Sequence, residues 1–161
     1  MNKHSSSPEE THVLSLASLH RAPRPIPEAL EAVHAGFPSV AQDYFFSDFS
    51  FDENIITHPA TTYAVRVAGD SMQGAGIFDG DLLLVDRALD AEDSDIVIAA
   101  LDGELTVKRL IAQPGVPPYL HPENPRYPNI AISDLQDFLI WGVVIGNYHF
   151  LSRKDSSWRP A

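Results

Sequence analysis

Alternating apolar and polar residues mark the centre of this chain as β structure. The stretch Thr62–Ala68 alternates so that Tyr63, Val65 and Val67 share one face. Residues 81–86 carry a nearly unbroken apolar run, which predicts a strand buried on both faces. A glycine-rich turn separates the two runs, so we expect a strand-turn-strand unit here.

A second pair of apolar runs, residues 95–101 and 104–110, flanks the dipeptide Asp102-Gly103. An Asp-Gly pair between two strand patterns is typical of a two-residue hairpin turn in which both central residues have positive φ. The sequence therefore predicts an antiparallel hairpin at this point.

The remaining C-terminal sequence predicts one more apolar element and two irregular segments. Residues 138–149 are strongly apolar and predict either a strand pair or one long strand bent at Gly142 and Gly146. Residues 112–129 hold six prolines, which cannot donate to a sheet, so we expect an irregular or edge segment. Residues 152–161 are polar and are expected to fray.

The N-terminal pattern predicts a flexible arm. Residues 1–24 are largely polar, and three prolines within residues 23–27 prevent a continuing helix. The apolar positions in residues 13–19 predict a short amphipathic turn or a strand that docks on the body of the protein. Residues 27–35 predict a brief helical turn that ends at Gly36.

Composition indicates one globular domain, which the strand patterns above make mainly β, and it limits the partners of the protein. A chain of 161 residues with 44% hydrophobic content can bury one ordinary core. The net charge of −11 disfavours binding to a phosphate backbone, which requires clustered Lys and Arg, and the short arm cannot supply a helix-turn-helix unit. We therefore expect protein partners and no direct DNA binding.

The absence of cysteine limits the chemistry of the protein, and the absence of a long apolar run indicates its compartment. The chain has no cysteine, which excludes disulfides, thiolate metal sites and a cysteine nucleophile. No apolar run approaches the roughly 20 residues of a membrane helix, and the N-terminus lacks the apolar core of a signal peptide. We expect a cytoplasmic protein without a membrane anchor.

The turn between the first two predicted strands holds the best candidate nucleophile, Ser71. Glycines are used where the backbone needs positive φ or where another segment approaches closely, so their density suggests a loop shaped to expose a side chain. Four of them surround the serine: Gly69, Gly74, Gly76 and Gly80.

Lys108 is the candidate general base. Strand alternation places it on the face of Thr106 and Leu110, while Arg109 points the other way. Burial among apolar strands lowers the pKa of a lysine from its reference value near 10.4, and a neutral amine can take the proton of a serine hydroxyl. Backbone N–H groups of the turn could then stabilise the oxyanion that forms when Ser71 attacks a peptide carbonyl.

Other chemistries remain open at the level of residue types. A Ser-His-Asp triad could use His58, His121 or His149, because the order of triad residues differs between folds. The seven histidines have no metal-ligand spacing, and the aspartates around Ser71 lack the glutamate of a calcium loop, so we expect no metal or cofactor.

These motifs resemble the LexA/UmuD superfamily of self-cleaving Ser-Lys proteins, the peptidase S24-like group. The similarity is carried by GDSM, the following GDLLLVD, and DGELTVKRL with its lysine 37 positions after the serine (108 − 71). It extends upstream to AGFPSVAQDY, which is similar to the segment that follows the cleavage site in the UmuD branch. It spans roughly residues 36–146.

The resemblance implies a LexA/signal-peptidase-like catalytic β domain over residues 36–151. It makes Ser71 the nucleophile, Lys108 the base, and Ala35–Gly36 the bond that is cleaved, with the backbone N–H groups of Asp70 and Ser71 as oxyanion donors. Two features differ from the best-known UmuD-type pattern. Alanine stands where that pattern has cysteine, which is the pairing of LexA repressors, and the released arm, residues 1–35, is longer.

The resemblance also implies a role and partners. A RecA filament on single-stranded DNA, formed during the SOS response to DNA damage, would stimulate self-cleavage. The trimmed homodimer would then serve a UmuC-type, error-prone translesion polymerase. The alternatives are a non-catalytic β-rich interaction module of the same fold, which regulates a polymerase or repressor, and a signal-peptidase-like enzyme that acts on other proteins.

Overall fold

The computed structural model describes residues 11–18, 26–29, 46–134 and 137–151. The chain divides into two compact units, a larger one of residues 1–19 and 60–161 and a smaller one of residues 20–59. No helix among the described residues is long and apolar enough to cross a membrane.

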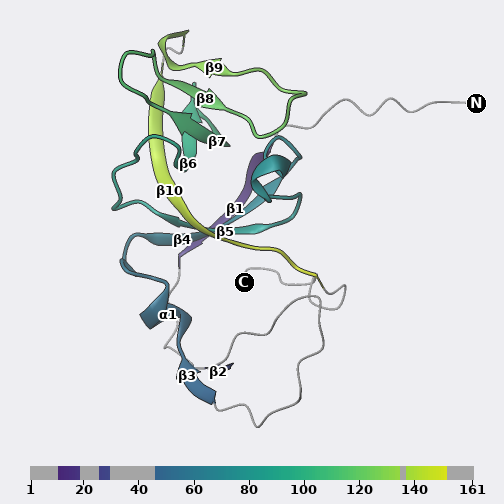
Figure 1. Cartoon of the computed structure of the whole chain (residues 1–161), viewed down its shortest axis with the longest axis vertical. Coiled ribbons are helices and arrows are strands. Elements are labelled where there is room, and N and C mark those ends of the chain that lie inside the picture. Colours follow the sequence, from purple (N-terminus) through teal and green to yellow (C-terminus); the bar gives the residue numbers. More distant parts are fainter. Residues whose placement is uncertain (1–10, 19–25, 30–45, 135–136, 152–161) are drawn as a thin grey trace, which may run out of the picture. The chain divides into compact units, whose positions relative to one another are not determined.

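The larger unit is built on one antiparallel sheet. Its eight strands in the described residues follow the spatial order β1-β4-β5-β10-β6-β7-β8-β9, and a further bridge joins β1 to β7 (Figure 1). The strands are β1 (His12–Ser18), β4 (Thr62–Ala68), β5 (Leu82–Asp86), β6 (Ile96–Leu101), β7 (Glu104–Ile111), β8 (Tyr119–His121), β9 (Ile130–Ala131) and β10 (Phe138–Tyr148). Two 3-10 helices, Gln73–Ala75 and Ile132–Asp134, complete it. The expected mainly β fold is confirmed.

The predicted hairpin is present between β6 and β7. Leu101 pairs with Glu104, and the two turn residues have φ values of 49° at Asp102 and 90° at Gly103. Because the turn fixes the register, it also fixes which residues of β7 face the core.

Residues 138–148 form one strand, so of the two predictions for this segment the single long strand is confirmed and the strand pair is wrong. Figure 1 shows β10 as a single long ribbon, and it pairs with β6 through its first half and with β5 through its second. Its pairing register shifts next to Gly142 and Gly146. A Cβ added at Gly142 would lie 2.7 Å from Val85 Cγ1, so this glycine permits the close approach of β10 to its neighbour β5.

Two strand predictions need correction. In β5, Leu83 and Val85 are fully buried but Leu82 and Leu84 are only half-buried, so one face of this strand is partly accessible. Residues 112–129 are irregular, as one alternative had it, except at β8, which lies between β7 and β9 and is therefore not at the edge of the sheet. The flanking prolines limit β8 to three residues.

The N-terminal segment is a strand where it is described. Residues His12–Ser18 pair along β4, which selects the docked strand over the amphipathic turn. The sequence could not decide this because seven residues of mixed pattern form stable structure only when a neighbour supplies the hydrogen bonds.

Where the smaller unit is described, at residues 26–29 and 46–59, it contains a two-stranded sheet and one helical turn. Strand β2 (Ile26–Ala29) pairs with β3 (Phe46–Phe49), and α1 (Phe51–Asn54) follows. The helical turn predicted for residues 27–35 is wrong over residues 27–29, where Pro27 favours an extended residue before it and β3 supplies a partner. Residues 30–36 lie outside the described residues.

The core of the larger unit consists of two groups of buried side chains. The first gathers residues from β4, β5, β6, β7 and the turn after β4, and the second lies between β6, β7 and β8. The first group comprises Val65, Val67, Met72, Ile77, Leu83, Val85, Ile98 and Val107. Since Met72 and Ile77 belong to it, the turn that carries Ser71 is anchored in the core.

Candidate active site

The Ser71 turn is closed at its base by backbone hydrogen bonds. The N–H of Gly80 donates to the carbonyl of Val67 at 2.9 Å, and the N–H of Val67 donates to the carbonyl of Asp81 at 3.0 Å. Gly69 has a φ of 94°, and its N–H donates to Asp79 Oδ1 at 2.9 Å. The turn is therefore a fixed loop, because both of its ends are held by β4 and β5.

Gly74 lets a second segment approach the same turn. Its N–H donates to the carbonyl of Glu123 at 2.7 Å, and an added Cβ would lie 2.5 Å from that oxygen. The glycine is thus required by close approach, one of the two reasons anticipated for glycine in this loop.

The structure brings Ser71 and Lys108 together. Lys108 Nζ lies 3.4 Å from Ser71 Oγ, and both residues are fully buried. The turn after β4 carries the serine, and the hairpin register directs the lysine of β7 toward it. The predicted pairing of these two residues in space is therefore present.

Two further contacts orient the lysine amine. Nζ lies 2.8 Å from Thr106 Oγ1 and 3.1 Å from the carbonyl of Val107. The threonine contact confirms that Thr106 and Lys108 share a face of β7. Burial penalises the charged ammonium, and an amine within hydrogen-bond reach of a serine hydroxyl can act as its general base.

The expectation that the serine is exposed is wrong. Ser71 has no accessible surface, because the chain at the start of β1 lies against it. The backbone N–H of Thr11 donates to Ser71 Oγ at 3.0 Å, and Thr106 Oγ1 donates to the carbonyl of Thr11 at 3.3 Å. Thr11 is also fully buried, and its hydroxyl has no hydrogen-bond partner in the part of the chain that is described.

Asp70 is held by the proline-rich segment after β8. Its carboxylate accepts hydrogen bonds from Arg126 and from the Tyr127 hydroxyl, and its carbonyl accepts one from Asn124 Nδ2 at 2.9 Å. The sequence reasoning missed these residues and Thr11, because no local pattern in a proline-rich loop or a polar arm indicates a contact 54 or 60 positions away.

The predicted oxyanion donors lie on this turn. Within the described ranges, no hydrogen bond uses the backbone N–H of Asp70 or Ser71. The predicted cleavage site, Ala35–Gly36, lies outside the described residues.

Two of the three histidines of the alternative triad, His121 and His149, have partners other than the serine. His121 Nδ1 is 2.7 Å from Asn129 Oδ1, and His149 pairs with the buried carboxylate of Asp81. The hydrogen bonds described for Ser71 Oγ come from Thr11 and Lys108. This geometry favours the serine-lysine pair over a Ser-His-Asp arrangement.

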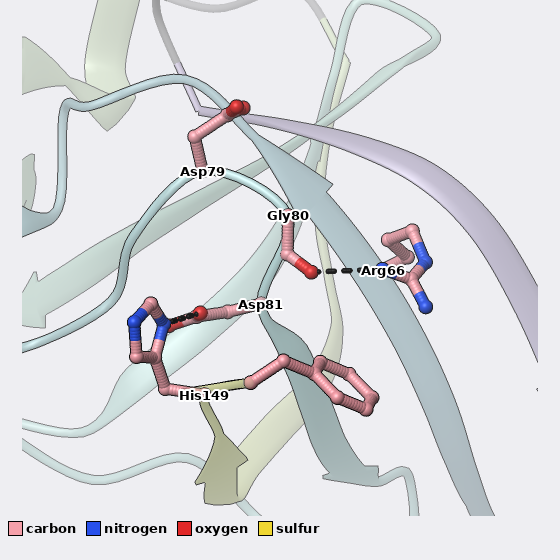
Figure 2. A pocket seen from close by; sticks show the side chains of 6 residues that line it. Arg66, Asp79, Gly80, Asp81 and His149 are labelled. Atoms are coloured by element: carbon pink, nitrogen blue, oxygen red, sulfur yellow. Dashed lines mark hydrogen bonds and ion pairs between the residues drawn. The ribbon is translucent and has the colours of Figure 1, made fainter. Parts of the chain in front are cut away.

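A pocket of about 260 Å³ lies at the base of the turn, between Arg66, Asp79, Gly80, Asp81, His149 and Phe150. Figure 2 shows two polar pairs in this pocket: Arg66 donates to the carbonyl of Gly80, and His149 contacts Asp81. Because Asp81 also accepts from the N–H of Phe78 at 2.8 Å, the pocket residues brace the junction between the turn and β5.

Comparison with known proteins places these features in one family. The model of the peptidase S24-like family matches residues 27–145. Protein MucA of Escherichia coli is 44% identical over 120 residues, covering 74% of this chain and 81% of the relative. Protein SamA of Salmonella typhimurium is 41% identical over 143 residues, covering 89% and 92%. The LexA repressor of Colwellia psychrerythraea is 37% identical over 145 residues, covering 84% and 67%.

Proposed function

The chain belongs to the peptidase S24-like family, and from this membership and the Ser71–Lys108 geometry we propose that it is a serine endopeptidase that acts chiefly on itself. Ser71 is the nucleophile, Lys108 is the general base, and the peptide bond Ala35–Gly36 is the substrate. The single observation that carries the proposal is the buried 3.4 Å contact between Lys108 Nζ and Ser71 Oγ.

In the first half of the reaction, Ser71 Oγ attacks the carbonyl carbon of Ala35 while neutral Lys108 takes the hydroxyl proton. The N–H groups of Asp70 and Ser71 donate to the oxyanion. The intermediate collapses when Lys108 gives the proton to the amine of Gly36, which leaves as the new N-terminus. An ester between Ala35 and Ser71 remains.

In the second half, Lys108 removes a proton from water, which attacks the ester carbonyl of Ala35. The tetrahedral intermediate releases Ser71 Oγ, and Lys108 returns the proton to it. The products are residues 1–35 with a free carboxylate and residues 36–161 with a free amine, so the catalyst is regenerated.

The biological role follows the UmuD branch of the superfamily. The SOS response to DNA damage provides RecA filaments on single-stranded DNA, which stimulate cleavage by stabilising the conformation that brings Ala35–Gly36 to Ser71. The trimmed protein, residues 36–161, forms a homodimer in the cytoplasm and acts as an accessory subunit of a UmuC-type translesion polymerase. The relatives MucA and SamA support this branch, because they match over most of their length.

Self-cleavage is tested by mass spectrometry of the purified full chain held at mildly alkaline pH. We expect fragments 1–35 and 36–161, formed faster as pH rises because the neutral fraction of the Lys108 amine increases. Ser71→Ala and Lys108→Ala should each abolish both fragments. A chain that stays intact under alkaline conditions and also with RecA filaments would refute the proposal and favour a non-catalytic interaction module.

A further inference from the structure

The peptide unit between Asp70 and Ser71 carries one of the proposed oxyanion donors, and one side chain, Asn124, makes the shortest hydrogen bond to its carbonyl. In a trans peptide the carbonyl of Asp70 and the N–H of Ser71 point in opposite directions. Whatever fixes the carbonyl therefore also aims the N–H. Asn124 Nδ2 donates to this carbonyl at 2.9 Å, and the turn itself adds a longer bond from the N–H of Gln73 at 3.3 Å.

Asn124 is itself held in one orientation. Its Oδ1 accepts the N–H of Arg126 at 3.1 Å, and its carbonyl accepts the N–H of Tyr127 at 3.1 Å. A side-chain amide has an acceptor oxygen at one end and an NH₂ donor at the other. Because one end meets the Arg126 N–H and the other meets the Asp70 carbonyl, only one orientation of the amide satisfies both contacts. With only 9% of its surface accessible, Asn124 has little freedom to rotate away.

The loop that presents Asn124 is attached to the catalytic turn at further points. The carbonyl of Glu123 accepts the N–H of Gly74, while Arg126 and Tyr127 hold the carboxylate of Asp70. The Glu123 side chain is in turn paired with Arg109 of β7, the strand that carries Lys108. This loop therefore links the serine turn to the lysine strand.

We infer that Asn124 is a positioning residue for the proposed self-cleavage: its amide holds the Asp70–Ser71 peptide so that the Ser71 N–H faces the developing oxyanion. The inference rests on the proposed function. Removing one oxyanion donor from a serine protease lowers the rate by about 10²–10³, so misaligning a donor should lower it by roughly 10- to 100-fold.

The test measures self-cleavage of the full chain as a function of pH for wild type, Asn124→Ala and Asn124→Asp. The aspartate variant keeps the acceptor for Arg126 and nearly the same shape, but it cannot donate to Asp70 and it adds a negative charge. It provides a second test if the alanine variant fails to fold. Asn129→Ala is the matched control, since Asn129 lies in the same segment, is exposed and bonds His121.

We expect both Asn124 variants to cleave roughly 10- to 100-fold more slowly, while the final fraction of cleaved chains is unchanged and Asn129→Ala matches wild type. In Asn124→Ala the pH at half-maximal rate should also stay at its wild-type value, because Lys108 is untouched. A purely structural role would instead reduce the fraction that cleaves. Wild-type rates in both Asn124 variants would overturn the inference while the proposed function stands, whereas a wild type that does not cleave would refute the function itself.

Discussion

At the scale of single residues, the site depends on how one amine is oriented. Lys108 Nζ lies closer to Thr106 Oγ1 than to Ser71 Oγ, at 2.8 Å against 3.4 Å. The Thr106 hydroxyl therefore positions the amine that must take the proton of the Ser71 hydroxyl. A β-branched side chain on a strand has restricted χ1, which makes threonine a firm support for this contact.

Replacing Thr106 tests this support. Thr106→Val keeps the branched shape but removes the oxygen, so we expect self-cleavage to slow by roughly 10- to 100-fold, since misplacing a catalytic group by about 1 Å can cost about 100-fold. Thr106→Ser keeps the oxygen and should retain most of the rate. The measurement is the first-order rate of fragment 36–161 formation at a fixed alkaline pH. Equal rates for the valine and serine variants would show that the hydroxyl has no positioning role.

At the scale of elements, β1 determines whether the serine is accessible. The Thr11 nitrogen lies 3.0 Å from Ser71 Oγ. The carbon of a scissile carbonyl must come to about 3–3.5 Å from the same oxygen before it is attacked. The start of β1 and the proposed scissile peptide would therefore compete for one place. The Thr11 hydroxyl is buried and has no hydrogen-bond partner among the described residues, which weakens the docked state, since an unmade hydrogen bond costs about 1–3 kcal/mol.

Two substitutions at Thr11 should change the rate of self-cleavage in opposite directions. Thr11→Pro removes the N–H that binds Ser71 and should speed cleavage by roughly two- to tenfold, because a net hydrogen bond is worth about 0.5–1.5 kcal/mol. Thr11→Val removes the unpartnered hydroxyl, stabilises the docked strand and should slow cleavage.

Quantitative gel analysis of basal cleavage without RecA measures both effects, with Thr11→Ser as the control that keeps the N–H and the hydroxyl. If proline slowed the reaction and valine accelerated it, the docked β1 would be assisting catalysis and the competition described above would be wrong.

At the scale of the whole molecule, net charge limits what the protein can bind directly. With 11 basic and 22 acidic residues, the chain cannot release many counterions from a nucleic acid. Any dependence of cleavage on single-stranded DNA must then act through another protein that binds both the DNA and this chain. The nucleoprotein filament that the family resemblance implies as the stimulating partner agrees with this charge balance.

This argument predicts that the full chain does not bind single-stranded DNA by itself. Fluorescence anisotropy of a labelled oligonucleotide should stay constant on titration at low salt, where electrostatic binding is strongest. The same oligonucleotide preloaded with RecA is the comparison, and there we expect an increase as the chain joins the filament. Binding to bare DNA that weakens steeply with added salt would contradict the prediction.

Much of the framework could be predicted because it is local. The strand Thr62–Ala68, the Asp102-Gly103 hairpin and the shared face of Thr106 and Lys108 follow from two-residue periodicity and from the backbone angles that a turn requires. The glycines of the Ser71 turn likewise signalled a special backbone and a close approach, both of which are present.

The tertiary structure alone decided which distant segments meet at Ser71. Nothing near Thr11 or Asn124 in the sequence indicates a contact with the serine turn, and the strand at residues 26–29 prevailed over a helical pattern only because β3 lies beside it. A periodic pattern specifies how a segment folds on itself. Contacts between segments depend on how the whole sheet pairs, which is why the burial of Ser71 and the support of Asp70 emerged only in the folded chain.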